Sequence, residues 1–169
     1  DKVLLASEDF KLYAVNINNG SQGWKDPFLS GDRIRKAPVV IGDNVYLTPE
    51  HSGLFRINAD TGVEYWFRNG IEKLVAVNPQ HVYGVDRLNH LVKMNRDTGG
   101  VISGLQLGPL TVRMTNHRTD RIYLATEEGL VICLREIERD LPHYHQNPQE
   151  QPILPQFAPE QPEAAKAAQ

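Results

Sequence analysis

Hydrophobic and polar positions alternate along short stretches of this chain, and polar turns separate the stretches. Residues 38–47, "PVVIGDNVYL", hold two apolar runs on either side of a Gly-Asp-Asn turn at 42–44. Residues 53–58, "GLFRIN", alternate again, and 63–67, "VEYWF", follow a second turn that ends in Gly62. The pattern predicts four short antiparallel strands joined by hairpin turns.

The same arrangement recurs about every 40 residues. Leucines in corresponding places, Leu12, Leu54, Leu91 and Leu130, mark the four units. Each follows a β-branched and aromatic stretch and a short polar turn. Four strands per unit of this length are typical of one β-propeller blade, and no stretch has a sustained helical period. The sequence therefore predicts an all-β fold, a β-propeller segment of four-stranded antiparallel blades, about two complete and two partial.

The composition changes near residue 140. Residues 141–169 contain six prolines and six glutamines but few large apolar side chains. Too little apolar surface is present there to offset the entropy of ordering. We therefore expect two parts, propeller blades at 1–140 and an irregular, Pro/Gln-rich C-terminal tail at 141–169, extended or disordered. We also expect part of the tail to cover the exposed face of the last blade.

The first and last units are incomplete as propeller blades. The stretch "KVLLAS" at 2–7 corresponds to the second strand of a blade, and the fourth unit has no fourth strand. Propellers close with roughly 4–8 blades. We therefore expect the chain to be the C-terminal part of a longer propeller protein. A half-ring that closes by pairing with another chain is the alternative.

Composition and charge limit the classes of partner that the chain is expected to bind. The 169 residues are 40% hydrophobic and 23% charged, with a formal net charge of −3. That charge gives no electrostatic reason to expect nucleic acid or an anionic membrane as a partner. No apolar run approaches the roughly 20 residues of a membrane-spanning helix. The single cysteine, Cys133, lies in the apolar run "GLVICL", which predicts a buried side chain.

Candidate catalytic chemistry is sparse. The sequence Asp-Thr-Gly occurs at 60–62 and 97–99, as in the paired loops of aspartic proteases. Both copies occupy the same turn of successive repeats, where Asp and Gly are ordinary turn residues. The histidines and the cysteine lack the spacing of a metal site, and no nucleophile motif is present. We therefore assign no catalytic, cofactor-binding or metal-binding residue and predict that the chain is not an enzyme.

One motif connects the repeats to a known family. "AVNINNGSQGW" resembles the tryptophan-docking motif of propellers similar to pyrroloquinoline-quinone (PQQ) dehydrogenases, in which a tryptophan stacks on the glycine turn of the next blade. The resemblance covers about residues 1–136. Ser103 stands where the third unit would have its tryptophan, and the fourth unit lacks the motif. The matching positions, which the resemblance implies are structural blade-docking residues, are Ala14, Asn16, Gly20, Trp24, Asn58, Gly62, Trp66, Asn95 and Gly99.

The resemblance implies two different functions. PQQ dehydrogenases hold the quinone and a calcium ion at the mouth of the propeller axis, and many have a pair of adjacent cysteines there. This chain has one cysteine and no residue that matches the ligand positions. Non-enzymatic relatives include the propeller lipoprotein of the outer-membrane β-barrel assembly machine, which binds partner proteins. Fold does not carry activity with it.

We therefore predict a non-enzymatic scaffold or protein-interaction module, periplasmic or otherwise associated with the bacterial cell envelope. Its expected partners are other protein chains or the missing blades of a larger propeller. The alternative is a C-terminal fragment of a PQQ-dependent oxidoreductase, with the PQQ and calcium site in blades not present here. A third hypothesis is a structural subunit whose tail threads through a larger assembly. Turn residues on one propeller face form the expected interaction surface: Glu50, His51, Arg87, Asn89, Glu127 and Glu128.

Overall fold

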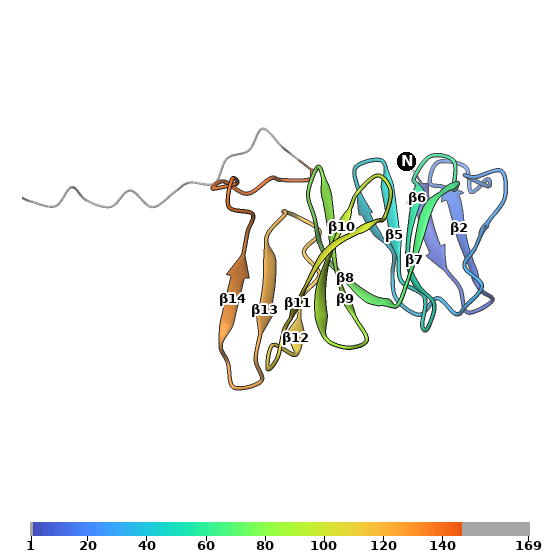
Figure 1. Ribbon diagram of the computed structural model, residues 1–169. Coiled ribbons are helices and arrows are strands. Elements are labelled where there is room, and N and C mark those ends of the chain that lie inside the picture. The colour runs from blue at the N-terminus through green and yellow to red at the C-terminus, as the bar shows by residue number, and fades with distance from the viewer. Residues whose placement is uncertain (1, 147–169) are drawn as a thin grey trace, which may run out of the picture.

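The computed structural model describes residues 2–146, and these form four antiparallel β-sheets that follow one another side by side (Figure 1). Two sheets have four strands and two have three, and in each sheet the strands neighbour one another in chain order. This arrangement confirms the predicted β-propeller segment with two complete and two partial blades. The predicted tail lies outside the described residues from residue 147 onward.

The sheets account for all fourteen strands of the described residues. The first contains β1 (Lys2–Ala6), β2 (Lys11–Asn16) and β3 (Phe28–Leu29). The second contains β4 (Val39–Ile41), β5 (Asn44–Leu47), β6 (Gly53–Asn58) and β7 (Glu64–Asn69). The third contains β8 (Ile71–Val77), β9 (His81–Asp86), β10 (His90–Asn95) and β11 (Val101–Gln106). The fourth contains β12 (Val112–Arg113), β13 (Ile122–Ala125) and β14 (Val131–Leu134).

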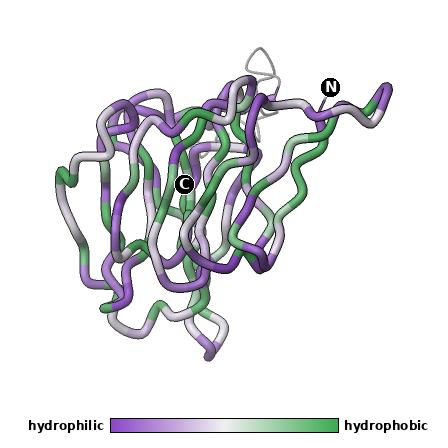
Figure 2. The backbone as a smooth tube through the Cα atoms, turned by 90° about the vertical axis from the view of Figure 1, so that its right-hand side faces the viewer, coloured by the Kyte–Doolittle hydropathy of each residue, from purple (hydrophilic) through white to green (hydrophobic). Residues whose placement is uncertain are grey.

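The core consists of three apolar clusters, one at each junction between successive sheets. The first junction contains Leu12, Trp24, Phe28, Val45 and Phe55, among others. The second contains Tyr46, Leu54, Trp66, Val82 and Met94, and the third contains Tyr83, Leu91, Leu107, Ile122 and Leu124, each with further members. A sheet buries its apolar face only against its neighbour, so the junctions supply most of the hydrophobic stabilisation. Figure 2 shows the hydrophobic segments along the strands and predominantly hydrophilic turns at their ends.

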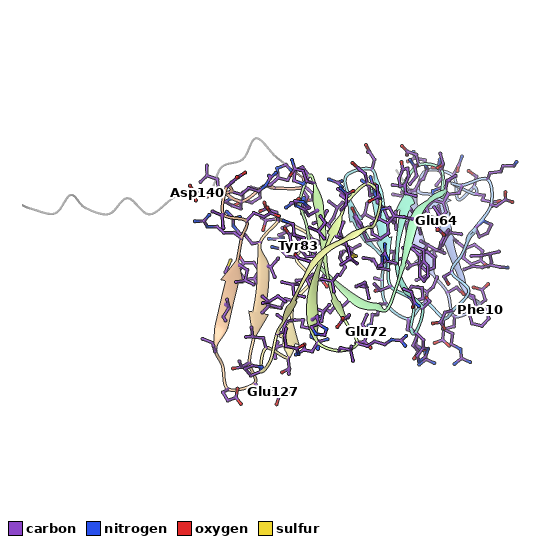
Figure 3. The ribbon with its side chains drawn as sticks, in the orientation of Figure 1. Phe10, Glu64, Glu72, Tyr83, Glu127 and Asp140 are labelled. Carbon is purple, nitrogen blue, oxygen red and sulfur yellow. The ribbon has the colours of Figure 1, made fainter. Side chains whose placement is uncertain are left out.

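The turns at one end of the sheets form what we call the lower face. It comprises the β1–β2, β5–β6, β9–β10 and β13–β14 turns and lies at the bottom of Figure 1. Figure 3 places Phe10 and Glu127 at this end, and Glu64 and Asp140 at the opposite end. The glycine turns of the tryptophan motif lie at the opposite end, which we call the upper face.

Two details of the fourth repeat differ from the expectation. Leu130 is 57% exposed, whereas Leu12, Leu54 and Leu91 are buried. Val131 pairs with Ala125 as Leu91 pairs with Val85, so Val131, which is itself 62% exposed, is the equivalent position and the repeat anchor at Leu130 was wrong by one residue.

The predicted burial of Cys133 is also wrong, because this residue is exposed. Strand β14 is the last strand of its sheet, and alternate residues along it face solvent. An apolar run at a sheet edge is buried only where another element covers it.

Candidate functional site

The lower-face hairpins share a backbone conformation that identifies one unusual residue. In the third and fourth sheets the turn places Asn89 and Gly129 at φ angles of 61° and 98°. Asn89 N–H bonds to the Asp86 carbonyl and Gly129 N–H to the Thr126 carbonyl, each at 3.2 Å. Asn and Gly are the residues that adopt this left-handed conformation at least cost.

In the first sheet the same turn position is occupied by Phe10, with φ at 70°. Its carbonyl oxygen accepts hydrogen bonds from the N–H and the hydroxyl of Ser30, at 2.9 and 3.0 Å. The residue is 45% exposed. The surroundings therefore fix a strained aromatic residue that faces solvent, and such an outlier is a sign of function. Sequence reasoning missed Phe10. Only the alignment with Asn89 and Gly129 in the folded hairpins shows that a phenylalanine occupies a left-handed turn position.

The structure joins two of the predicted interaction residues, His51 and Arg87, across the second junction. Glu50 and His51 lie in the β5–β6 turn, and Arg87 and Asn89 lie in the β9–β10 turn. The Arg87 guanidinium donates to the His51 carbonyl. The Asn89 side chain is used internally, since it accepts from Arg113 at 2.7 Å and donates to the Gly108 carbonyl at 3.0 Å.

Glu127 and Glu128 lie in the β13–β14 turn of the fourth sheet, on the same lower face. Figure 3 shows Glu127 at its end. Both residues are exposed. The six residues therefore share one face but form two groups, one on the turns of the second and third sheets and one on the turn of the fourth sheet.

An exposed leucine accompanies the first group. Leu88, between Arg87 and Asn89 in the sequence, is 72% exposed. It borders a groove of about 360 Å³ whose lining also includes Val92 and Val101. Apolar side chains within a polar turn surface are typical of protein-contact sites.

On the upper face, each tryptophan lies against the glycine turn of the next sheet. The Trp24 indole N–H donates to the Ala59 carbonyl at 2.9 Å, and the Trp66 indole N–H donates to the Arg96 carbonyl at 2.8 Å. A Cβ atom added at Gly62 would lie 2.6 Å from Trp24 Cδ2, and one at Gly99 would lie 2.7 Å from Trp66 Cδ2. Both indoles are therefore packed directly on a glycine backbone, and both are less than 10% exposed, at 3% and 7%.

The remaining motif residues build the turn itself. The Asn58 side-chain oxygen accepts from the N–H groups of Asp60 and Thr61, both at 2.9 Å. Asn95 makes the same pair of bonds in the third sheet, and Asn16 accepts from Asn18 N–H in the first. These bonds replace backbone partners that an isolated turn lacks, which explains asparagine at this position. Ala14 is buried beside Trp24 in the first junction, and Gly20 ends the equivalent turn of the first sheet.

The third junction has no tryptophan and contains a polar cluster instead. Glu136 follows β14, and its Oε1 atom accepts from the Tyr83 hydroxyl. The same oxygen lies 2.9 Å from Lys93 Nζ and 2.8 Å from His81 Nδ1. Burial alone would raise the pKa of Glu136, but the hydrogen bonds from Tyr83 and Lys93 outweigh it and lower the pKa to about 2. Burial, and then the bond to Glu136, raise the pKa of Tyr83.

The Glu136 cluster predicts acid sensitivity. The carboxylate titrates near pH 2 in the folded chain but near 4.5 when unfolded, so its stabilising effect is complete above pH 4.5. That effect is lost as the pH falls from 4.5 to 2. We expect Glu136→Gln to flatten the loss of stability over this interval, measured as urea midpoints at successive pH values. Glu127→Gln removes the same charge from an exposed turn and is the control; equal flattening by both variants would contradict the role of the cluster.

The described part of the chain contains no cluster of metal-ligating side chains and no membrane-spanning helix. Between residues 2 and 146, no three His, Cys, Asp or Glu side chains are close enough together to hold a metal ion. No helix in this part of the chain is long and apolar enough to cross a membrane.

The repeats and the sheet arrangement define the class of protein as a β-propeller of the PQQ-like repeat type. A sequence model described as outer membrane protein assembly factor BamB matches residues 1–88, and the chain belongs to this family. No curated protein sequence matches the chain.

One solved structure supports the fold. The crystal structure of BamB from Moraxella catarrhalis superposes with a TM-score of 0.58 at 14% sequence identity, over 79% of this chain and 46% of that chain. The chain therefore spans less than half of that structure. Two other matches are the N-terminal domain of Nup159 and the WD40 domain of SCAP from fission yeast, with TM-scores of 0.45 and 0.46 and identities of 14% and 13%. They cover 80% and 82% of this chain, and 41% and 43% of theirs.

Proposed function

We propose that this chain is part of a non-enzymatic scaffold of the bacterial cell envelope, and that it binds another protein through its lower face. Membership of a family described as an outer membrane protein assembly factor supports the envelope and the scaffold role. Residues 1–140 act as the propeller unit, and residues 141–169 are an appendage to it. The partners are other protein chains or further blades of the same propeller.

The observation that carries the proposal is Phe10. A phenylalanine in the left-handed region costs about 1–2 kcal/mol, and the equivalent turns lower this cost with Asn89 and Gly129. An aromatic ring that is 45% exposed gains little from folding in return. Burial of that ring against a partner offsets the cost, because aromatic side chains dominate the energetics of protein interfaces.

The proposal predicts opposite effects of one substitution on stability and on binding. Phe10→Asn, which introduces the residue found at the equivalent position of the third sheet, is expected to raise the free energy of unfolding by about 0.5–1 kcal/mol. The same variant is expected to retain its envelope partners about tenfold less well. The measurement is quantitative mass spectrometry of proteins retained by the immobilised complete protein, together with denaturant unfolding.

Ile17→Asn provides a matched control. Ile17 is 62% exposed but follows β2, at the upper end of the first sheet. This substitution removes a similar apolar side chain and is expected to leave retention unchanged. Equal loss of partners from both variants would mean that general surface hydrophobicity is being measured. Unchanged retention by a stabilised Phe10→Asn variant would contradict binding through the lower face.

A further inference from the structure

The third junction contains a cavity that nothing in the described chain fills. Its volume is about 520 Å³, within the range of small-ligand sites. Tyr83, Leu91 and Lys93 line it from the third sheet. Ile122 and Leu134 line it from the fourth sheet, as do residues 135–138 beyond β14. Figure 3 labels Tyr83, which lies in this central region of the molecule.

The strand pairing identifies this cavity as the tryptophan site of the third junction. Across the second sheet, Tyr46 pairs with Arg56, and Arg56 pairs with Trp66. Across the third sheet, Tyr83 pairs with Lys93, and Lys93 pairs with Ser103. Ser103 therefore occupies the position of Trp66, and it is exposed on β11.

The surface of the next sheet that faces this position is also equivalent at the two junctions. Trp66 packs with Val82 and Met94, which pair with one another in the third sheet. Ile122 and Leu134 form the same pair in the fourth sheet, and both line the cavity. The cavity thus shares one apolar wall with the site of the Trp66 indole at the second junction, and charged residues such as Lys93 and Glu136 line the rest of it.

The polar end of the cavity differs from that of the second junction. Arg96, whose carbonyl accepts the Trp66 indole N–H, corresponds to Glu136. The Glu136 carbonyl already accepts from Arg139 N–H at 3.0 Å and from the Arg135 guanidinium at 3.3 Å. A carbonyl oxygen has two lone pairs, so both positions are in use. An aromatic ring without an N–H group, such as that of phenylalanine, therefore suits this site better than an indole.

The last described residues of the chain are fixed beside the cavity. His143 N–H donates to the Asp120 carboxylate at 3.0 Å, and His145 N–H donates to the Arg118 carbonyl at 2.9 Å. Asp120 itself lines the cavity. Beyond Gln146 the sequence contains a single aromatic residue, Phe157, with two other large apolar residues, Ile153 and Leu154.

We propose that the cavity binds the ring of Phe157 from the chain's own C-terminal segment. Phe157 lies eleven positions after Gln146, and this stretch spans up to roughly 36 Å when extended. That reach is ample for a cavity that borders the point where the described chain ends. The covalent connection raises the effective concentration of the ring, and the prolines at 152, 155 and 159 reduce the freedom lost on docking.

Hydrogen exchange of the complete protein tests this site. Phe157→Ala is expected to speed exchange of the amides of residues 134–138 about tenfold, since burial of a phenylalanine ring is lost. Gln156→Ala changes the neighbouring polar residue and is expected to leave these rates within about twofold. Neither substitution alters a residue of the described fold.

A second variant tests whether the change in hydrogen exchange arises from occupation of the cavity. Ser103→Phe supplies an aromatic ring without an N–H from β11, at the position that Trp66 fills at the second junction. In that background Phe157→Ala is expected to have no further effect, because the cavity is already occupied. Unchanged exchange in Phe157→Ala alone would overturn the proposal. Protection that appears only when a partner protein is added would also overturn it, and would identify that partner as the occupant.

Discussion

Replacing Trp66 with alanine is expected to lower the free energy of unfolding by about 3–5 kcal/mol. Trp66 is 7% exposed and packs at the second junction with residues of both sheets, including Leu54 and Met94. Its loss leaves a cavity in the apolar cluster between the two sheets, and it removes the indole bond to the Arg96 carbonyl. Denaturant unfolding of the complete protein, followed by circular dichroism, measures the change.

Tyr65 is the control for this prediction. It neighbours Trp66 on β7 but is 49% exposed, with its hydroxyl bonded to Asn58 at 2.6 Å. Tyr65→Ala is expected to cost about 1 kcal/mol. If Trp66→Ala cost no more than Tyr65→Ala, the proposal that tryptophan ties one blade to the next would fail.

The features that the sequence predicted are those set by local chemistry. Alternation with a period of two and turn residues at fixed offsets identified the hairpins, and the repeat of about 40 residues identified the blades. The Gly-x-x-x-Trp motif could be recognised in the sequence because its glycine and tryptophan lie close together in the chain. The indoles of Trp24 and Trp66 then bond to carbonyls 35 and 30 residues away, and only the repeat made that pairing foreseeable.

The features that the sequence did not predict depend on contacts that occur in one blade or at one junction and do not recur in the others. The apolar run around Cys133 looks like a core strand, but burial depends on whether another element covers β14. The strain at Phe10 depends on the register of its hairpin, which becomes visible only when the folded hairpins of the third and fourth sheets are compared with it. Glu136 joins residues 43 to 58 positions earlier in the sequence, so no local pattern could identify its cluster.

The three junctions therefore use two kinds of contact. Two of them bury an indole on a glycine turn, and the third holds a carboxylate with Tyr83 and Lys93 beside an open cavity. Apolar burial does not depend on pH, whereas the carboxylate cluster does. The third junction is for this reason the one at which conditions or a bound side chain would most readily change the stability of the propeller.

The second large effect is expected at Gly62. Gly62→Ala is expected to cost about 3 kcal/mol, because two unfavourable effects coincide there. The residue has a φ of 75°, which costs an alanine about 1 kcal/mol, and its new Cβ would lie 2.6 Å from Trp24 Cδ2. The indole is held by its bond to the Ala59 carbonyl, so it cannot move away freely.

Gly20 provides a matched control within the same chain. Its φ is 69°, and its N–H bonds to the Asn16 carbonyl at 2.9 Å, as Gly62 N–H bonds to Asn58. A Cβ added at Gly20 meets nothing within 4 Å, because no described sheet precedes the first one and supplies a tryptophan. Gly20→Ala is therefore expected to cost only about 1 kcal/mol, the strain of the backbone alone.

The difference between the two glycines isolates the contact between blades, and a double-mutant cycle assigns it. In a Trp24→Ala background, Gly62→Ala is expected to cost only as much as Gly20→Ala, because the overlapping indole is gone. Denaturant midpoints of the four variants supply the coupling free energy. A cost at Gly62 that stayed near 3 kcal/mol without Trp24 would show that strain within the turn, and not the packing of one blade on the next, selects glycine there.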